Sequence, residues 1–306
     1  MSQLAILFPG QRSQEKGMGR DAAEAKPEIM ALWERAEKAS GLALRGIFWE
    51  GSEAEMADTR ALQPALSVVN LSLWLLRGKD LAPLAAAGHS LGEFSALAAA
   101  GALGIEDALD AVCLRGRLMA EAASPDQGMT ALVKLSREAV EGIVDAARAA
   151  AGAPLVLANL NSPAQYVLSG EKRALAAAAE LAKEKKGRAI ALAVSGAFHS
   201  PLVREAADEF ATFLKKLSWS APKFPVFCNA TAAAESDPAK IAANMCGQMT
   251  SPVRWQETIE NLWGLGARRF VEFGPKGVLT KLLKANLEGR TEPWEARNIA
   301  ALAEAG

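Results

Sequence analysis

The sequence has very few of the residues that support metal and redox chemistry: two histidines and three cysteines among 306 residues. The cysteines, Cys113, Cys228 and Cys246, have no C-x-x-C spacing, so we interpret them as small core residues of a reduced protein without a disulfide framework. The same counts nearly exclude a histidine-rich zinc site, and we expect no metal. Any mechanism that needs an imidazole must use His89 or His199.

An excess of charge of one sign is also absent. The 34 basic side chains nearly balance the 35 acidic ones, which argues against a general nucleic-acid binder. The longest largely apolar stretch, residues 94–103, is too short to span a bilayer, and residues 1–8 lack the basic start of a signal peptide. We therefore expect no nucleic-acid or membrane partner and a cytoplasmic location. Half of the residues are hydrophobic, which is enough for a sizeable core.

Strand-like and helix-like segments alternate along most of the chain, and this alternation predicts an α/β fold with a largely parallel sheet. Residues 288–306 lack strong periodicity, and we assign them to a C-terminal tail. The segments read as strands are 4–8, 84–88, 226–229 and 269–273, and those read as helices are 27–40, 65–76, 91–100, 107–122, 201–217, 252–262 and 278–286.

The middle of the chain has a different rhythm. Four strand-like runs and two helices follow one another in the order β-α-β-β-α-β, which is that of a ferredoxin-like subdomain. We place this subdomain at 129–194, inserted into a larger domain made of 1–128 and 195–287. Its strands are predicted at 129–135, 155–160, 165–169 and 188–194, and its helices at 136–151 and 171–186.

The strongest local signal is the pentapeptide Gly88-His89-Ser90-Leu91-Gly92. It matches the G-x-S-x-G pattern of a nucleophile elbow, and it lies between a predicted strand and a predicted helix, as that motif requires. The N–H of Leu91, at the start of the helix, can stabilise a developing oxyanion. The alternative is a glycine-rich turn in which Ser90 only caps the helix. The strand-turn-helix context favours the nucleophile.

A serine hydroxyl is a weak nucleophile and needs a base. His89 is adjacent to Ser90 and would point off the other side of the tight turn. His199 lies in a loop between a predicted strand and a predicted helix, where the active sites of α/β folds gather. An isolated histidine is more often a buried, hydrogen-bonded one. Beside an elbow serine that has no other base, we expect His199 to be the general base.

Seven groups of residues, in order along a stretch that runs from about Leu4 to Leu283, extend this interpretation. They are Phe8-Pro9-Gly10-Gln11; Gly88-His89-Ser90-Leu91-Gly92-Glu93; Arg115-Gly116 with Met119; Asn159 with Asn161-Ser162-Pro163; Gly196-Ala197-Phe198-His199-Ser200; Ser251-Pro252-Val253; and Glu272-Phe273-Gly274-Pro275. Together they resemble the malonyl-CoA:acyl carrier protein transacylases, the family of the fatty-acid enzymes and of the acyltransferases of polyketide synthases.

The resemblance implies a fold and a reaction. The fold is a large α/β-hydrolase-like domain with a ferredoxin-like small subdomain. The reaction moves a malonyl group from malonyl-CoA to the phosphopantetheine thiol of an acyl carrier protein, in fatty-acid or polyketide synthesis. A ping-pong course passes through an acyl-Ser90 ester. No cofactor is implied, because the coenzyme A thioester is a substrate.

The resemblance also implies roles for individual residues. Ser90 would be the acylated nucleophile and His199 its base. Gln248 would orient the imidazole through its main-chain carbonyl, so no carboxylate is required. The backbone N–H groups of Gln11 and Leu91 would form the oxyanion hole.

Three further residues are implied to bind substrate: Arg115, Phe198 and Asn159. Arg115 would hold the free malonyl carboxylate, for which the planar fork of a guanidinium is well suited. Phe198 would occupy the space that the α-methyl group of methylmalonyl needs. The alternative for Arg115 is a surface arginine on its helix. Arg117, two positions on, faces elsewhere and does not share this role.

Two features depart from the family pattern or stay open. Arg12 stands where the family loop has a second glycine, although an arginine tolerates positive φ poorly. It would either contact a phosphate or an acidic carrier protein, or lie in solvent. The basic cluster at the end of the small-domain helix has the same two interpretations, docking of an acidic carrier or coenzyme A against a solvated helix end; it comprises Lys183, Lys185, Lys186 and Arg188.

Two other functions compete with acyl transfer. An acyl-thioester hydrolase, either an esterase or a proofreading acyl-carrier-protein hydrolase, would use the same Ser90 and His199. Arg115 discriminates between them, because a hydrolase of simple acyl groups needs no carboxylate clamp. A catalytically silent carrier-docking module is the third possibility, and the intact Ser90 and His199 argue against it.

Overall fold

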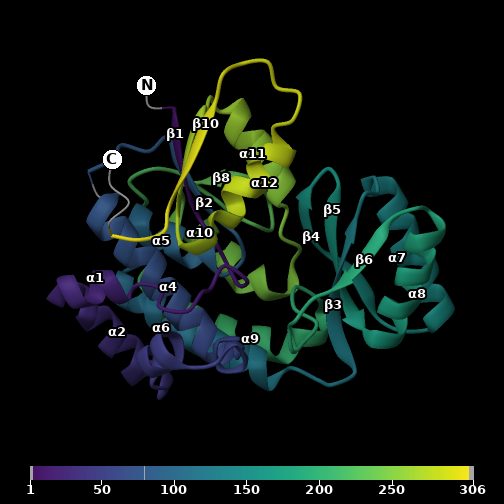
Figure 1. Cartoon of the computed structure of the whole chain (residues 1–306), viewed down its shortest axis with the longest axis horizontal. Helices are drawn as coiled ribbons and strands as arrows, with labels where there is room; N and C mark the ends of the chain where they lie inside the picture. The colour runs from purple at the N-terminus through teal and green to yellow at the C-terminus, as the bar shows by residue number, and fades with distance from the viewer. Residues whose placement is uncertain (1–2, 79, 303–306) are drawn as a thin grey trace.

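Two β-sheets organise the part of the chain that the structure describes, residues 3–78 and 80–302 of a computed structural model (Figure 1). The larger sheet has six strands in the order β10-β9-β1-β2-β7-β8, and the smaller has four in the order β4-β5-β3-β6. The predicted α/β fold class is confirmed. Helices of the described residues are all too short or too polar to cross a bilayer.

The large sheet is parallel apart from one short edge strand. β8 (Ala234–Glu235) is antiparallel to its neighbour, whereas the five other strands run parallel. β1 lies near the centre, and all five of its residues are buried, as expected for a parallel strand covered on both faces. The parallel strands are β1 (Leu4–Phe8), β2 (Ala85–Gly88), β7 (Val226–Phe227), β9 (Arg269–Phe273) and β10 (Glu295–Ile299).

Successive side chains of β1 enter two different cores because side chains alternate along a strand. Ile6 and Phe8 belong to the larger core, together with α2 (Pro27–Ser40), α4 (Thr59–Arg77), α5 (Gly92–Ala100) and α6 (Ile105–Glu121). Ala5 and Leu7 belong to the core on the opposite face, with α11 (Trp255–Gly264) and α12 (Val278–Asn286). The sheet is therefore sandwiched between helices, and the ends of its strands stay free for loops.

The remaining helices of the large domain are short or cover its edges. They are α1 (Arg20–Ala25), a π-helical turn at Gly46–Glu50, α3 (Glu53–Met56), α9 (Arg204–Leu214) and α10 (Pro238–Gly247). Short 3-10 turns at Pro201–Val203, Gln248–Thr250 and Pro275–Gly277 connect neighbouring elements.

The small sheet is antiparallel throughout and forms a second lobe beside the large one (Figure 1). One face packs under α7 and α8, and the opposite face contributes Met129, Ala131 and Val167 to the larger core. The predicted ferredoxin-like order is confirmed. Its elements are β3 (Gln127–Val133), α7 (Arg137–Ala151), β4 (Leu155–Ser162), β5 (Gln165–Glu171), α8 (Lys172–Glu184) and β6 (Arg188–Ala191).

Several predicted boundaries were wrong. The helix expected from residue 65 begins at Thr59, because Asp58 caps it by accepting from the N–H of Arg60, and Pro64 lies inside the helix. The helix expected at 201–217 is a 3-10 turn followed by α9, and the helix expected at 252–262 begins later, at Trp255. The strands expected at 188–194 and 226–229 are shorter, and β4 extends through Ser162.

The segment assigned to a C-terminal tail contains a strand of the large sheet. β10 pairs in parallel with β9 and forms the sheet edge. Two of its five residues are exposed and two are half-buried, and only Ile299 is buried, so period-2 patterning was weak in the sequence. Positions 303–306 of the predicted tail lie outside the described residues.

Because Ile299 is 4% exposed and part of the larger core, Ile299→Ala should lower the free energy of unfolding by ~2–5 kcal/mol. The matched control is Arg297→Ala on the same strand, where the side chain is exposed and the change should stay within ~0.5 kcal/mol. Urea unfolding monitored by circular dichroism measures both. Equal midpoints for the two variants would mean that β10 adds nothing to the core.

Candidate active site

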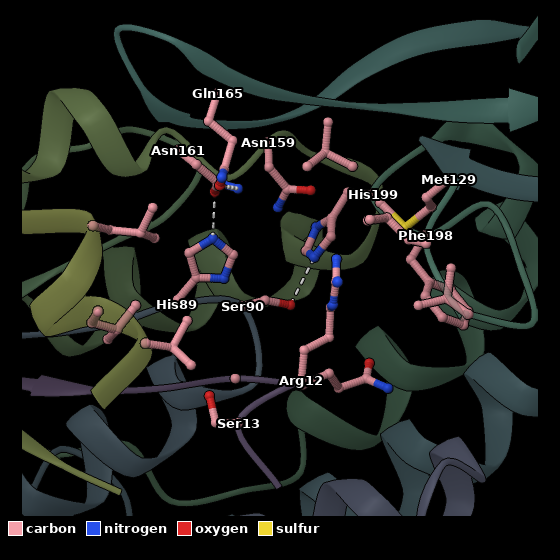
Figure 2. A pocket seen from close by; sticks show the side chains of 18 of the residues that line it. Arg12, Ser13, His89, Ser90, Met129, Asn159, Asn161, Gln165, Phe198 and His199 are labelled. Atoms are coloured by element: carbon pink, nitrogen blue, oxygen red, sulfur yellow. Dashed lines mark hydrogen bonds between the residues drawn. The ribbon is translucent and has the colours of Figure 1, made fainter. Parts of the chain in front are cut away.

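A cavity of about 570 Å³ opens where the carboxyl ends of β1 and β2 face the small sheet (Figure 2). This is the end of a parallel α/β sheet at which ligands bind. Its lining combines the loop after β1, the turn after β2, the small sheet, the loop before α9, and α12; the members used below are Gln11, Arg12, Ser13, His89, Ser90, Asn159, Asn161, Gln165, Phe198 and His199.

Ser90 occupies a turn that only small neighbours permit. A Cβ at Gly88 would lie 2.0 Å from the backbone of Gly92, and one at Gly92 would lie 2.0 Å from the carbonyl oxygen of Phe8. Ser90 itself has φ 51°, in the left-handed region that a non-glycine residue rarely adopts. The strained turn lifts the hydroxyl into the cavity, as a nucleophile elbow does.

His199 lies directly against the serine. Its Nε2 is 2.7 Å from Ser90 Oγ, and its Nδ1 is 3.2 Å from the carbonyl oxygen of Gln248 and 3.0 Å from that of Ser251. Carbonyl oxygens only accept hydrogen bonds, so Nδ1 carries the proton and Nε2 presents its lone pair to the hydroxyl. The expected carbonyl of Gln248 is present, and that of Ser251 was missed by the sequence.

Burial keeps this imidazole neutral. Burial, together with the nearby cation Arg115 and the ring of His89, lowers the pKa of His199 to about 3. A neutral imidazole can accept a proton from Ser90 at any pH above that value. The arrangement suits a general base that needs no carboxylate to hold it.

Arg115 is fully buried behind the nucleophile, on α6. Its Nη2 donates to Ser90 Oγ at 3.1 Å and to Gln248 Oε1 at 3.1 Å, and its Nη1 donates to Gln63 Oε1 at 2.9 Å. Its Nε has no hydrogen-bond partner in the described part of the chain. Burial lowers the pKa of Arg115 to about 10, opposed by the carboxylate of Glu93, so the guanidinium stays charged at neutral pH.

The surface alternative for this arginine is therefore wrong. Arg117, on the same helix, is the exposed one, and it pairs with Glu121 and Glu209. The Nε and Nη2 atoms form the edge of a guanidinium that binds a carboxylate bidentately. Here Nε–H is without a partner among the described residues, whereas Nη2 donates to Ser90 Oγ and Gln248 Oε1.

The loop after β1 packs directly on the elbow. A Cβ at Gly10 would lie 2.4 Å from the carbonyl oxygen of His89, so the two backbones touch. Gln11 lines the cavity beside Ser90, and Leu91 is buried at the start of α5. The two residues expected to supply the oxyanion hole thus come from adjoining backbones.

Arg12 adopts φ 81°, the strained conformation that the glycine of the family loop would take without cost. Its side chain lines the cavity, and Figure 2 shows it rising from the loop toward His199. Phe198 and Asn159 also line the cavity, on the sides of the loop before α9 and of β4.

His89 points away from the serine hydroxyl. Its Nε2 is 2.8 Å from Asn161 Oδ1 (Figure 2). Its ring packs against Trp255 with centroids 5.5 Å apart. Asn161 in turn donates to Gln165. The structure thus brings His199, and not His89, to Ser90.

Two residues that hold the elbow were not identified from the sequence. The N–H of Ser90 donates to Asn229 Oδ1 at 2.6 Å, and Asn229 Nδ2 donates to the carbonyl of Gly88 at 2.6 Å. Glu93 is a buried carboxylate below the turn. It is part of the quoted motif, which gave a signal but no role, whereas Asn229 carries no local signal. No group of three or more His, Cys, Asp or Glu within the described residues is placed to hold a metal ion.

Comparison with known proteins agrees with this geometry. The model of the acyl transferase domain family matches residues 6–303. The malonyl CoA-acyl carrier protein transacylase of Bacillus subtilis is 39% identical over 287 residues, which are 93% of this chain and 90% of that protein.

Two solved structures are similar over nearly the whole chain. An acyl carrier protein S-malonyltransferase from Vibrio cholerae superposes with a TM-score of 0.90 at 36% identity, covering 98% of this chain and 97% of that one. A type II polyketide acyl-carrier protein in complex with its malonyl-transacylase, PlMCAT:AntF, contains a chain with a TM-score of 0.90 at 35% identity, covering 98% and 96%. The chain therefore belongs to the acyl transferase family that includes the malonyl CoA-acyl carrier protein transacylases.

Proposed function

We propose that this protein transfers a malonyl group from malonyl-CoA to the phosphopantetheine thiol of an acyl carrier protein. The observation that carries the proposal is the buried Arg115 guanidinium 3.1 Å from Ser90 Oγ. A carboxylate next to the nucleophile would find a charged partner there, and without one its desolvation would be costly. Relatives named as malonyl CoA-acyl carrier protein transacylases support the same substrate and partner.

The first half-reaction forms an ester. Ser90 Oγ attacks the thioester carbonyl carbon while its proton passes to His199 Nε2. The backbone N–H groups of Gln11 and Leu91 stabilise the oxyanion. The C–S bond then breaks, and the coenzyme A sulfur leaves with the proton from His199. Malonyl-Ser90 and coenzyme A are the products. Arg115 holds the malonyl carboxylate through its Nε–H, which has no partner among the described residues, and through the Nη2 hydrogen that pointed to Ser90 Oγ before that oxygen became part of the ester.

The second half-reaction reverses these steps with a different thiol. His199 Nε2 accepts the proton of the phosphopantetheine thiol, and the sulfur attacks the ester carbonyl. Collapse of the tetrahedral intermediate breaks the C–Oγ bond, and His199 returns the proton to Ser90. No cofactor enters either half. Gln248 and Ser251, through their carbonyl oxygens, keep the imidazole oriented throughout.

Hydrolysis is the less favoured alternative. Water would replace the carrier thiol in the second half-reaction, and the same Ser90 and His199 would serve. A hydrolase of simple acyl groups has no use for a buried guanidinium at the nucleophile, and the relatives bear transacylase names.

The carrier protein and the pathway complete the proposal. An acidic carrier would find positive charge at Arg12, on the cavity lining, and at the exposed cluster Lys183, Lys185, Lys186 and Arg188 at the end of α8. Fatty-acid and polyketide synthesis both use this reaction, and we place it in the cytoplasm.

Malonyl-CoA should add one malonyl group to Ser90, and Ser90→Ala should abolish the addition because no other nucleophile of the described residues is paired with His199. Intact-mass spectrometry with peptide mapping measures it. The control is Ser13→Ala, a cavity residue with no partner for its hydroxyl in the described structure, which should still be labelled. Persistent acylation of the Ser90→Ala variant would refute the assignment.

Arg115→Ala should lower kcat/KM for malonyl-CoA ~30-fold or more relative to acetyl-CoA, since only malonyl loses a charge partner. Arg115→Lys should recover part of the loss, because an ammonium lacks the bidentate fork. The control on the same helix is Arg117→Ala, whose exposed side chain should leave the ratio unchanged. If acetyl-CoA and malonyl-CoA lose equally, Arg115 is structural.

Phe198 is 3% exposed and lines the cavity, which supports the proposal that it occupies the space an α-methyl group would need. We expect malonyl-CoA to be preferred over methylmalonyl-CoA, by a finite ratio because one methyl is worth only ~1–3 kcal/mol. Phe198→Ala should reduce that preference ~10-fold or more. Competition kinetics with both thioesters measures it, and an unchanged ratio in the variant would assign the preference to another residue.

A further inference from the structure

Glu93 is a carboxylate that the proposed transfer does not use, although it lies in the first turn of α5, three positions after the nucleophile. Its side chain is almost fully buried, with 1% exposed. An isolated buried carboxylate is costly, so its surroundings must supply donors. The surroundings of Glu93 do supply donors, and these donors are residues that also contact the turn at Ser90.

Two hydrogen bonds connect Glu93 to the elbow. Its Oε2 accepts from Gln248 Nε2 at 2.8 Å, and its Oε1 accepts from the backbone N–H of Asn229 at 3.1 Å. The thiol of Cys228 is a further hydrogen-bond partner. Asn229 in turn accepts from the N–H of Ser90, so the carboxylate is two hydrogen bonds from the nucleophile's backbone.

A second chain runs from Glu93 to the buried guanidinium. Gln248 Nε2 also donates to the carbonyl oxygen of Ser90 at 2.9 Å, and Gln248 Oε1 accepts from Arg115 Nη2 at 3.1 Å. No carboxylate of the described residues forms a salt bridge with Arg115, and Glu93 is the one whose charge acts on it. The buried cation is thus compensated through an intervening amide.

We propose that the ionised Glu93 is a positioning residue for acyl selection, because it fixes the side-chain amide of Gln248 so that its oxygen faces Arg115. This inference deepens the proposed malonyl transfer and rests on it. An ionised carboxylate can only accept hydrogen bonds, so Gln248 must turn its NH₂ toward Glu93 and the Ser90 carbonyl. Its oxygen is then left for Arg115.

A proton on the carboxyl reverses this pattern. A neutral acid, or a glutamine, would place a donor against the NH₂ of Gln248. The amide would then either lose its hydrogen bond to residue 93 or turn over, and turning over would set its NH₂ against Arg115, which has only donors, and its oxygen against the carbonyl oxygen of Ser90. In both cases Gln248 no longer holds its oxygen firmly toward Arg115. The guanidinium would lose the partner that holds it beside Ser90, and malonyl would suffer more than acetyl.

The charge state of Glu93 changes in an accessible range. Burial raises the pKa of Glu93 to about 7, against lowering by the donors Gln248 and Asn229, by the cation Arg115 and by the thiol of Cys228. The pKa of His199 is lowered to about 3, so the base stays neutral throughout this range. A fall in the malonyl-to-acetyl ratio of kcat/KM as the pH drops through neutrality would therefore report protonation of Glu93 and not of His199.

The experiment measures kcat/KM for malonyl-CoA and acetyl-CoA from pH 5.5 to 8.5 with the wild-type protein and Glu93→Gln. The ratio of the two cancels titration of the coenzyme A phosphates, which both substrates share. In the wild type the malonyl-to-acetyl ratio should fall as the pH drops through about 7. In Glu93→Gln the ratio should be low, by ~10-fold or more at pH 8, and independent of pH.

The matched control is Glu272→Gln. Glu272 is also a fully buried carboxylate with a pKa raised by burial, but its partners are the backbone of Leu279 and Thr280 and the hydroxyl of Thr280. It should keep the pH-dependent ratio of the wild type. A ratio in Glu93→Gln equal to the wild-type ratio at every pH would overturn the positioning role. A wild type that transfers no malonyl at all would instead contradict the proposed function.

If Glu93→Gln fails to fold, a double variant still tests whether Glu93 compensates Arg115. If the carboxylate compensates Arg115, then Glu93→Gln with Arg115→Gln should lower the unfolding midpoint by less than the sum of the two single changes, because both charges leave together. Recovery of folded protein for the double variant alone would support the pairing. Additive losses, or misfolding of the double variant as well, would show that Glu93 acts on the fold independently of Arg115.

Discussion

The buried guanidinium of Arg115 is the constraint on which the site is built. A cation without solvent needs acceptors, and Gln63, Gln248 and the hydroxyl of Ser90 supply them. The same charge lowers the pKa of His199 and acts on the carboxylate of Glu93. Nucleophile, base and acyl selection are therefore coupled electrostatically, and a change at any one of these groups reaches the others.

The fold supplies the geometry that this coupling requires. Parallel strands end together, so the loop after β1 and the turn after β2 meet at one edge of the sheet, with backbones close enough that only glycine fits at Gly10, Gly88 and Gly92. His199 comes from the loop before α9, and its orientation comes from carbonyls at the end of α10 and beyond. Backbone acceptors cannot titrate, which keeps the base in one tautomer at every working pH.

Much of the fold and the nucleophile could be predicted because their signals are local. The elbow needs small residues at fixed spacing, and β9 and α12 have the predicted bounds 269–273 and 278–286. β10 was not predicted, because its one buried residue, Ile299, gives no period-2 pattern. Asn229 escaped because its contact with Ser90 spans 139 positions, and no spacing in the sequence reveals such a partner. The role of Gln248 was seen only in its carbonyl, since side-chain amide contacts depend on packing.

The small sheet shares its cavity-facing side with the larger core, through Met129, Ala131 and Val167. These three side chains are apolar, so separating the two lobes would expose them to water at a cost that grows with the apolar area uncovered. Wide hinge opening is thus disfavoured, and thioester and carrier arm must thread into a preformed slot. Coenzyme A must then leave the slot before the phosphopantetheine arm of the carrier protein can enter it. The acylated protein keeps the same conformation between these two steps.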